Sequence, residues 1–139
     1  MAAYAGKLLL IKKNTGTSGS PVWTSIGGLQ TKGITINNTL VEITNDDSTY
    51  GVEYLAGAGI TEFSVTGEGV SKDGAVDKAL AAQAVARTSS GFQVIVPGIG
   101  TFQGDMLVEQ YQLTGTTKAE GRFQFTLKNA EGGMTFTAE

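Results

Sequence analysis

The chain has 139 residues, enough for one domain that buries about two-thirds of the surface its unfolded chain exposes. Histidine and cysteine are absent, which removes the commonest nucleophile and base pairs and the commonest zinc ligands. The 10 basic and 13 acidic residues give a net charge of −3, and the basic residues are scattered, whereas a protein that grips nucleic acid needs clustered lysine and arginine. No apolar stretch approaches the length of a membrane span, and no signal-peptide core is present, so we expect a soluble chain.

Alternation of apolar and polar residues predicts β-strands from the beginning of the chain onward. The first strands are expected at residues 7–13, 29–37 and 40–44, with turns at 14–20 and 26–28. Trp23 is expected to lie between two turns, as a core or interface anchor. Residues 45–59 show no clear periodicity, and a loop of that length inside a compact domain is usually functional or ordered by a partner.

The middle of the chain combines one more strand with the only helical pattern. Phe63 and Val65 predict an inward face that Gly67 and Gly69 continue. A helix is expected over residues 73–87, with Asp73 as N-cap and Arg87 at the negative carbonyl end. Because its apolar side is mostly alanine, we expect this helix to lie close against a sheet.

The second half of the chain reads as strands separated by tight turns. Phe92, Val94 and Val96 share one face, as do Phe123, Phe125 and Leu127. Further strands are expected at residues 101–113 and around Met134 and Phe136, with turns at 97–98, 114–119 and 131–133. The apolar parity changes within 101–113, which predicts a bulge near Glu109 and Gln110.

Several short motifs could suggest chemistry, and each is better explained as ordinary structure. Asn45-Asp46-Asp47-Ser48 lacks the spacing of a calcium loop and reads as a polar turn. Gly57-Ala58-Gly59 and Gly98-Ile99-Gly100 lack the third glycine or the lysine of phosphate-binding loops. The carboxylates that could form a catalytic pair lie mostly on the polar strand faces; they are Glu62, Glu68, Asp105, Glu109 and Glu120. The sequence therefore predicts no catalytic residue, no cofactor and no metal site.

The order and spacing of segments along nearly the whole chain resemble the major tail protein family of long-tailed bacteriophages and gene transfer agents. The segments that carry the resemblance are Gly6 to Leu10, Leu29 to Lys32, Val41 to Gly74, Phe92 to Gly104, Phe123 to Leu127 and Met134 to Phe136.

The resemblance implies a fold, an assembly and a role. The fold is mainly β, an antiparallel β-sandwich or partial barrel with one flanking α-helix, formed by residues 1–139 as a single domain. About six copies close into a ring, each lending strands to an inner barrel, and rings stack into a tail tube through which double-stranded DNA passes without specific binding. Implied partners are the tail tip, terminator and tape-measure proteins, and the implied location is the tail of a virion or phage-like particle, after synthesis in the bacterial cytoplasm.

The resemblance also implies two groups of functional residues. The long loop is expected to bridge adjacent rings, through Asn45, Asp46, Asp47, Tyr50, Tyr54 and Leu55. The sparse basic residues and polar strand faces suggest that the lumen is lined by Glu62, Glu68, Gln103 and Asp105. Two alternatives remain open at this stage, a carbohydrate-binding β-sandwich module and the related tube protein of a secretion system.

Overall fold

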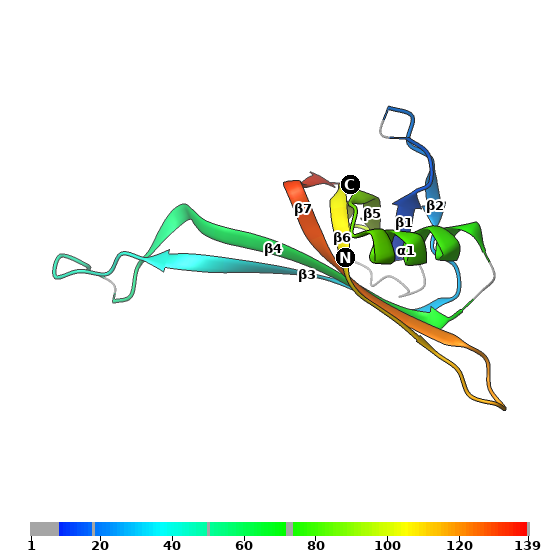
Figure 1. Cartoon of the computed structure of the whole chain (residues 1–139). Helices are drawn as coiled ribbons and strands as arrows, with labels where there is room; N and C mark the ends of the chain where they lie inside the picture. The colour runs from blue at the N-terminus through cyan, green and yellow to red at the C-terminus, as the bar shows by residue number, and fades with distance from the viewer. Residues whose placement is uncertain (1–8, 18, 50, 72–73, 139) are drawn as a thin grey trace.

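A computed structural model describes residues 9–17, 19–49, 51–71 and 74–138 of the chain. They form seven strands and one helix (Figure 1), in the order β1 Leu10–Asn14, β2 Trp23–Ser25, β3 Leu29–Glu42, β4 Tyr54–Val70, α1 Ala75–Ala86, β5 Ser90–Val96, β6 Gly100–Thr114 and β7 Arg122–Ala138. All the strands belong to one sheet with the order β2-β1-β5-β6-β7-β4-β3, and every neighbouring pair is antiparallel. The expected mainly β, antiparallel fold with one flanking helix is confirmed.

The core lies between one face of this sheet and α1. The alternating residues expected to face inward do so, since Phe92, Val94, Phe123, Phe125 and Leu127 are all buried. The other fully buried side chains are Ile11, Val65, Leu80 and Met106. Gly67 and Gly69 continue the inward face of β4, as the sequence predicts.

β6 and β7 are long strands that join two halves of the sheet. β5 pairs with β6 only over residues 100–106, whereas β4 pairs with β7 only over residues 122–128. Beyond these ranges the neighbours diverge, and the side-chain oxygen of Asn129 accepts a hydrogen bond from the Phe63 N–H at 3.0 Å where β4 leaves β7. The predicted bulge in β6 is confirmed, because Glu109 is an extra residue between the Val108 and Gln110 pairs.

The hairpin of β3 and β4 extends far from the body of the molecule (Figure 1). Two expectations about it are wrong. The strands expected at residues 29–37 and 40–44 are one strand, Leu29–Glu42, and the connecting loop covers residues 43–53, not 45–59. Residues 54–59 belong to β4, where residues 56–59 form an irregularity opposite Leu40, and Gly57 and Gly59 adopt positive φ. Glycine tolerates that conformation, so the strand continues through a stretch whose composition resembles a turn.

The N-terminal end of α1 differs from the prediction, and the C-terminal end agrees with it. Gly74, in an extended conformation, occupies the N-cap position that we expected for Asp73, and Asp73 lies outside the described residues. At the other end Arg87 caps the helix in the left-handed region, with φ 59, and donates its N–H to the Gln83 carbonyl oxygen at 2.9 Å.

Three smaller expectations also need correction. Trp23 begins β2 instead of lying between turns, and Met134 and Phe136 belong to β7 instead of a separate strand. The predicted turn at 131–133 lies within a four-residue bulge of β7 between the Asn129 and Met134 pairs. Of the strand expected at 7–13, the structure describes Leu10–Asn14 as β1, and residues 1–8 lie outside the described part.

Candidate functional site

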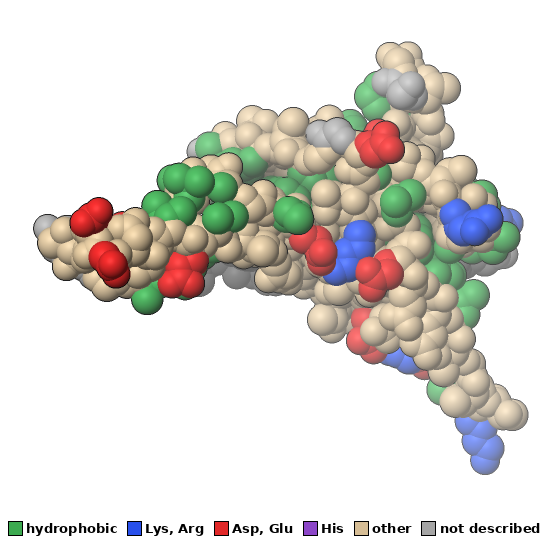
Figure 2. All heavy atoms as spheres, turned by 60° about the vertical axis from the view of Figure 1, so that its left-hand side comes forward, with side chains coloured by type: hydrophobic (Ala, Val, Ile, Leu, Met, Phe, Trp, Pro, Cys, Tyr) green, Lys and Arg blue, Asp and Glu red, His purple; other side chains and the backbone are tan. Residues whose placement is uncertain are grey.

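The part of the β3–β4 hairpin beyond Phe63, residues 37–62, is called the arm below. It carries seven of the large apolar side chains that are exposed among the described residues, and these are Leu40, Val41, Ile43, Val52, Tyr54, Leu55 and Ile60. Figure 2 shows apolar side chains gathered along this extension. Ile60 is 72% exposed and Leu40 58% exposed, although β-strands normally bury one apolar face. An isolated two-stranded ribbon is only marginally stable in water, and an exposed apolar surface of this kind is typical of an interaction site.

The tip of the arm is held by its own hydrogen bonds. The side-chain oxygen of Asn45 accepts from the Asp47 N–H at 2.8 Å, and the Ser48 hydroxyl accepts from the Asn45 N–H at 3.0 Å. The Ile43 N–H donates to the Glu53 carbonyl oxygen at 2.9 Å and closes the loop. These bonds confirm the reading of Asn45 to Ser48 as a polar turn.

The arm is uniformly acidic in its charged residues. Glu42, Asp46, Asp47 and Glu53 lie at or next to its tip, and no lysine or arginine occurs between Lys32 and Lys72. Figure 2 shows carboxylates without cations at this end of the molecule.

A hollow of about 280 Å³ lies in the arm beside the irregularity of β4. Its lining is mostly small or apolar and consists of Asn38, Leu40, Tyr54, Leu55, Ala56, Gly57, Ala58, Gly59 and Thr61. The small residues of the 56–59 run leave this space open, and polar atoms contribute more of its exposed lining than apolar atoms do.

Open strand edges are the second conspicuous feature. In one half of the sheet β6, β7, β4 and β3 lie side by side, with β3 as the outermost strand. β6 forms the opposite border. Its edge away from β7 has no strand partner beyond Met106 in the described structure, because the pairing with β5 ends there. Both borders of this four-stranded portion thus present unpaired backbone groups, which invite pairing with another chain.

The face of the four-stranded portion turned away from the core is polar. Lys128 Nζ lies 2.6 Å from Glu62 Oε1 and 3.8 Å from Glu109 Oε2. The hydrogen bond to Glu62 raises the pKa of Lys128; desolvation opposes this, and the charges of Glu62 and Glu109 reinforce it. Arg122 Nη1 lies 3.4 Å from Glu120 and its Nη2 lies 3.9 Å from Glu68. Each cation on this face is therefore shared by two carboxylates.

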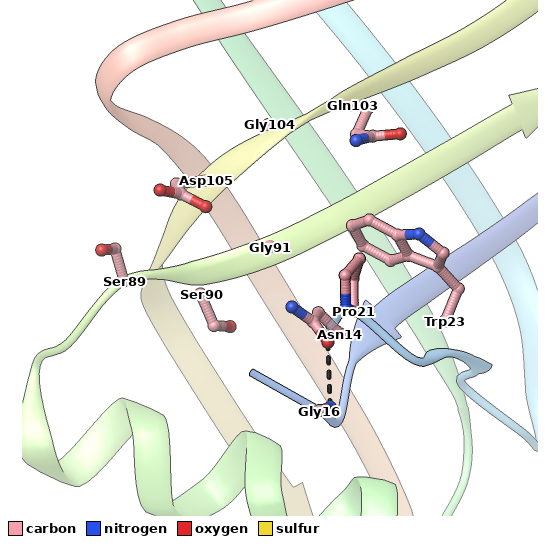
Figure 3. A pocket seen from close by; sticks show the side chains of 10 residues that line it. All are labelled: Asn14, Gly16, Pro21, Trp23, Ser89, Ser90, Gly91, Gln103, Gly104 and Asp105. Atoms are coloured by element: carbon pink, nitrogen blue, oxygen red, sulfur yellow. Dashed lines mark hydrogen bonds between the residues drawn. The ribbon is translucent and has the colours of Figure 1, made fainter. Parts of the chain in front are cut away.

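Gln103 and Asp105 lie on the same face of the sheet but in its other half. They line a concavity of about 360 Å³ together with Trp23 and Gly91 (Figure 3). The Trp23 ring occupies the space above Gly91, where an added Cβ would lie 3.1 Å from the ring. Asp105 is the only ionisable residue that lines the concavity, and Ser89 and Ser90 contribute hydroxyl groups to the lining.

Among the described residues, no group of three or more metal-ligating side chains is placed to hold a metal ion. No helix in the described part of the chain is long and apolar enough to cross a membrane.

Comparison with known proteins decides the family. The family model for the phage tail tube protein matches residues 3–135. The chain belongs to the phage tail tube protein family. A chain in the structure described as the tail of an empty GTA particle, obtained by helical refinement with C6 symmetry, is 33% identical and has a TM-score of 0.88, and the match covers 98% of this chain and 100% of that one.

Two further structures resemble this tail tube protein. A chain of the native gene transfer agent virion is 31% identical over 98% of this chain and 100% of that one, with a TM-score of 0.85. The SPP1 tail tube is 14% identical over 99% of this chain and 80% of that one, and its TM-score of 0.74 shows the shared fold. None of the curated proteins matches the sequence.

Family membership supports the tail tube reading over the two alternatives, the carbohydrate-binding module and the secretion-system tube. Of the expected stacking residues, Asn45, Asp46 and Asp47 lie in the loop at the tip, whereas Tyr54 and Leu55 lie in β4 and Tyr50 lies outside the described residues. The four lumen candidates all lie on the sheet face opposite α1, but as two separate pairs, Glu62 with Glu68 and Gln103 with Asp105.

Sequence reasoning missed one part of this site and one buried polar residue of the core. It took residues 54–59 for a loop, although the apolar residues on both sides of the glycines were a signal for a bulged strand. It also missed Lys13, which is 5% exposed and donates a hydrogen bond to Ser90 Oγ at 2.8 Å. Burial lowers the pKa of Lys13, and nothing in the spacing of Lys12 and Lys13 shows which one is buried.

Proposed function

We propose that this tail tube protein closes into rings of about six copies, and that the rings stack into a hollow tube that conducts double-stranded DNA without catalysis. The observation that carries the proposal is the pair of open edges on the four-stranded portion of the sheet. The C6 symmetry in the description of the 33% identical tail chain supports the number of copies.

Strand direction supports closure into a ring. Along the order β6-β7-β4-β3 each strand runs opposite to its neighbour, so β3 runs opposite to β6. When copies are related by rotation about a common axis, β3 of one copy meets β6 of the next in the antiparallel sense. A closed barrel then removes every exposed edge of this portion.

The polar face suits the lumen of such a barrel. Carboxylates outnumber cations there, and Arg122 and Lys128 already have carboxylate partners. Since binding to DNA rests on cations that neutralise phosphates, this wall would let the duplex slide. Glu68 belongs to the barrel portion, and Glu62 lies at the base of the arm, two residues beyond the Ser64–Lys128 pair. Gln103 and Asp105 are proposed to line the continuation of the barrel in the other half of the sheet.

Electron microscopy tests the assembly directly. Concentrated purified protein in negative stain is expected to show rings, or tubes with a central channel. A protein that stays a monomer at every concentration, seen by light scattering, would contradict the proposal.

Shortening the arm tests its part in stacking. Replacement of residues 43–53 by Asn-Gly keeps β3 and β4 joined by a two-residue turn and removes the acidic tip. We expect rings without tubes, because the strand edges of the barrel portion are untouched. Tubes of normal length would show that the tip does not bridge rings.

Charge reversal tests the lumen. Tubes that carry Glu62→Lys and Glu68→Lys should retain duplex DNA at low ionic strength, whereas unmodified tubes should release it, as measured by fluorescence anisotropy of labelled DNA. Asp77→Lys, on α1 across the sheet, is the matched control. Equal DNA retention in both variants would place Glu62 and Glu68 outside the lumen.

A further inference from the structure

The arm and the β6–β7 hairpin point away from the same sheet in opposite directions. Val70 at the end of β4 pairs with Arg122 at the start of β7, so the β6–β7 connection, residues 115–121, lies at the end of the sheet opposite the arm. Figure 1 shows the two hairpins at opposite ends of the molecule. In a stack of rings that all face the same way, the arm of one ring is therefore directed toward the β6–β7 hairpins of the next.

The two ends carry complementary charge. The arm has acidic residues and no basic ones. The β6–β7 connection carries Lys118 at its tip, and its one acidic residue, Glu120, is already paired with Arg122 at 3.4 Å. Figure 2 shows acidic side chains (red) at the end of the arm and basic side chains (blue) at the end of the opposite hairpin.

We propose that the arm of one copy meets the β6–β7 hairpin of a second copy in the adjacent ring tip to tip, with Lys118 facing Asp46 and Asp47. This contact rests on the proposed stacking of rings and names its two surfaces. It gives the stack a direction, because two arms facing each other would bring only carboxylates together.

Exchanging the charges of the two tips tests this contact. Lys118→Glu alone, or Asp46→Lys with Asp47→Lys alone, is expected to lower the pelletable tube fraction about tenfold or more at low salt, since each exposed pair is weak but recurs in every copy of the ring. The combination of all three substitutions should restore the fraction to near that of the unmodified protein. Lys12→Glu, on the distant strand β1, is the matched control.

Circular dichroism checks that every variant folds. Asp46, Asp47 and Lys118 are exposed, and Lys12 is half-buried.

The outcomes separate the two proposals. If the unmodified protein forms no rings or tubes, the proposed function fails and this contact fails with it. If tubes form, and the triple charge variant is no better than the single reversals or Lys12→Glu is equally harmful, only the contact between the arm and the hairpin is overturned.

Discussion

Lys13 is an isolated cation inside the core face of β1. Its Nζ donates to Ser90 Oγ and lies 5.2 Å from the centre of the Phe92 ring. Ser90 in turn donates to Gln83 Oε1 at 2.6 Å, and Gln83 Nε2 donates to the Met106 carbonyl oxygen at 3.0 Å. This chain of hydrogen bonds ties β1, β5, α1 and β6 together, but it includes no carboxylate to balance the charge.

We expect Lys13→Met to raise the free energy of unfolding by about 1 kcal/mol at pH 7. The reason is that desolvation of the ammonium group destabilises the fold by more than its hydrogen bond and ring contact stabilise it. Burial lowers the pKa of Lys13 in the folded state, so between that lowered pKa and the ordinary lysine value of 10.5 the unfolded chain binds more protons. The native protein should therefore gain stability relative to the variant as pH rises toward 10.5. Urea unfolding against pH measures this, and a pH dependence no larger than that of Lys12→Met would contradict it.

Gly67 makes room for the core at a single position of β4. A Cβ there would lie 2.5 Å from Phe125 Cζ and 3.0 Å from Leu29 Cδ2. Gly67→Ala should lower the free energy of unfolding by about 1–3 kcal/mol through overpacking. Gly33→Ala on the neighbouring strand is the matched control, since its Cβ would meet only Thr66 Oγ1 at 3.6 Å. Equal unfolding midpoints in urea for the two variants would show that the Phe125 ring moves aside freely.

At the scale of elements, the helix ends in a strained residue. Arg87 adopts φ 59, a conformation that costs a non-glycine residue about 1 kcal/mol. Arg87→Gly should therefore exceed Arg87→Ala in thermal stability by about that amount, while both lose the same favourable charge at the helix C-terminus. If the two variants melted together, the left-handed cap would carry no cost.

Elements with a clear alternation could be predicted from the sequence. Phe123, Phe125 and Leu127 indicate their strand because the chain's own core covers that face. The Tyr54 to Ile60 stretch could not be predicted, since its apolar residues have no core of the same chain beneath them and its glycines imitate a turn. Pairing of β7 with β4, and the long β6 and β7 that link both halves of the sheet, depend on contacts between distant segments and leave no local pattern.

In the candidate site too, local structure could be predicted from the sequence, and contacts between distant segments could not. The polar turn from Asn45 to Ser48 is a local structure, so its residues predicted it. The opposition of Arg122 to Glu68 and of Lys128 to Glu62 depends on the register of β4 against β7, which no spacing in the sequence reveals.

At the scale of the whole molecule, the subunit has a protected body and exposed borders. β5 lies between β1 and β6, whereas one edge of β3 is open along its length. In hydrogen exchange of the isolated subunit, amides of β5 should exchange slowly and those of β3 quickly. Assembly should slow exchange in β3 by at least about tenfold, because barrel closure supplies the missing partners. Unchanged exchange of β3 in tubes would mean that another part of the chain joins the copies.

The single extra residue in β6 bears on the calibre of the channel. Antiparallel pairing of β3 with β6 of the next copy is possible in a ring of any size. The direction of the strands therefore does not fix the number of copies. The angle between neighbours must come from curvature, and a strand curves where one residue is inserted against its partner. Glu109 is such an insertion, so deleting it should flatten the wall and admit additional copies. The diameter of the tube would then be set by residues inserted in the backbone of a strand, and substitutions of side chains could leave that diameter unchanged.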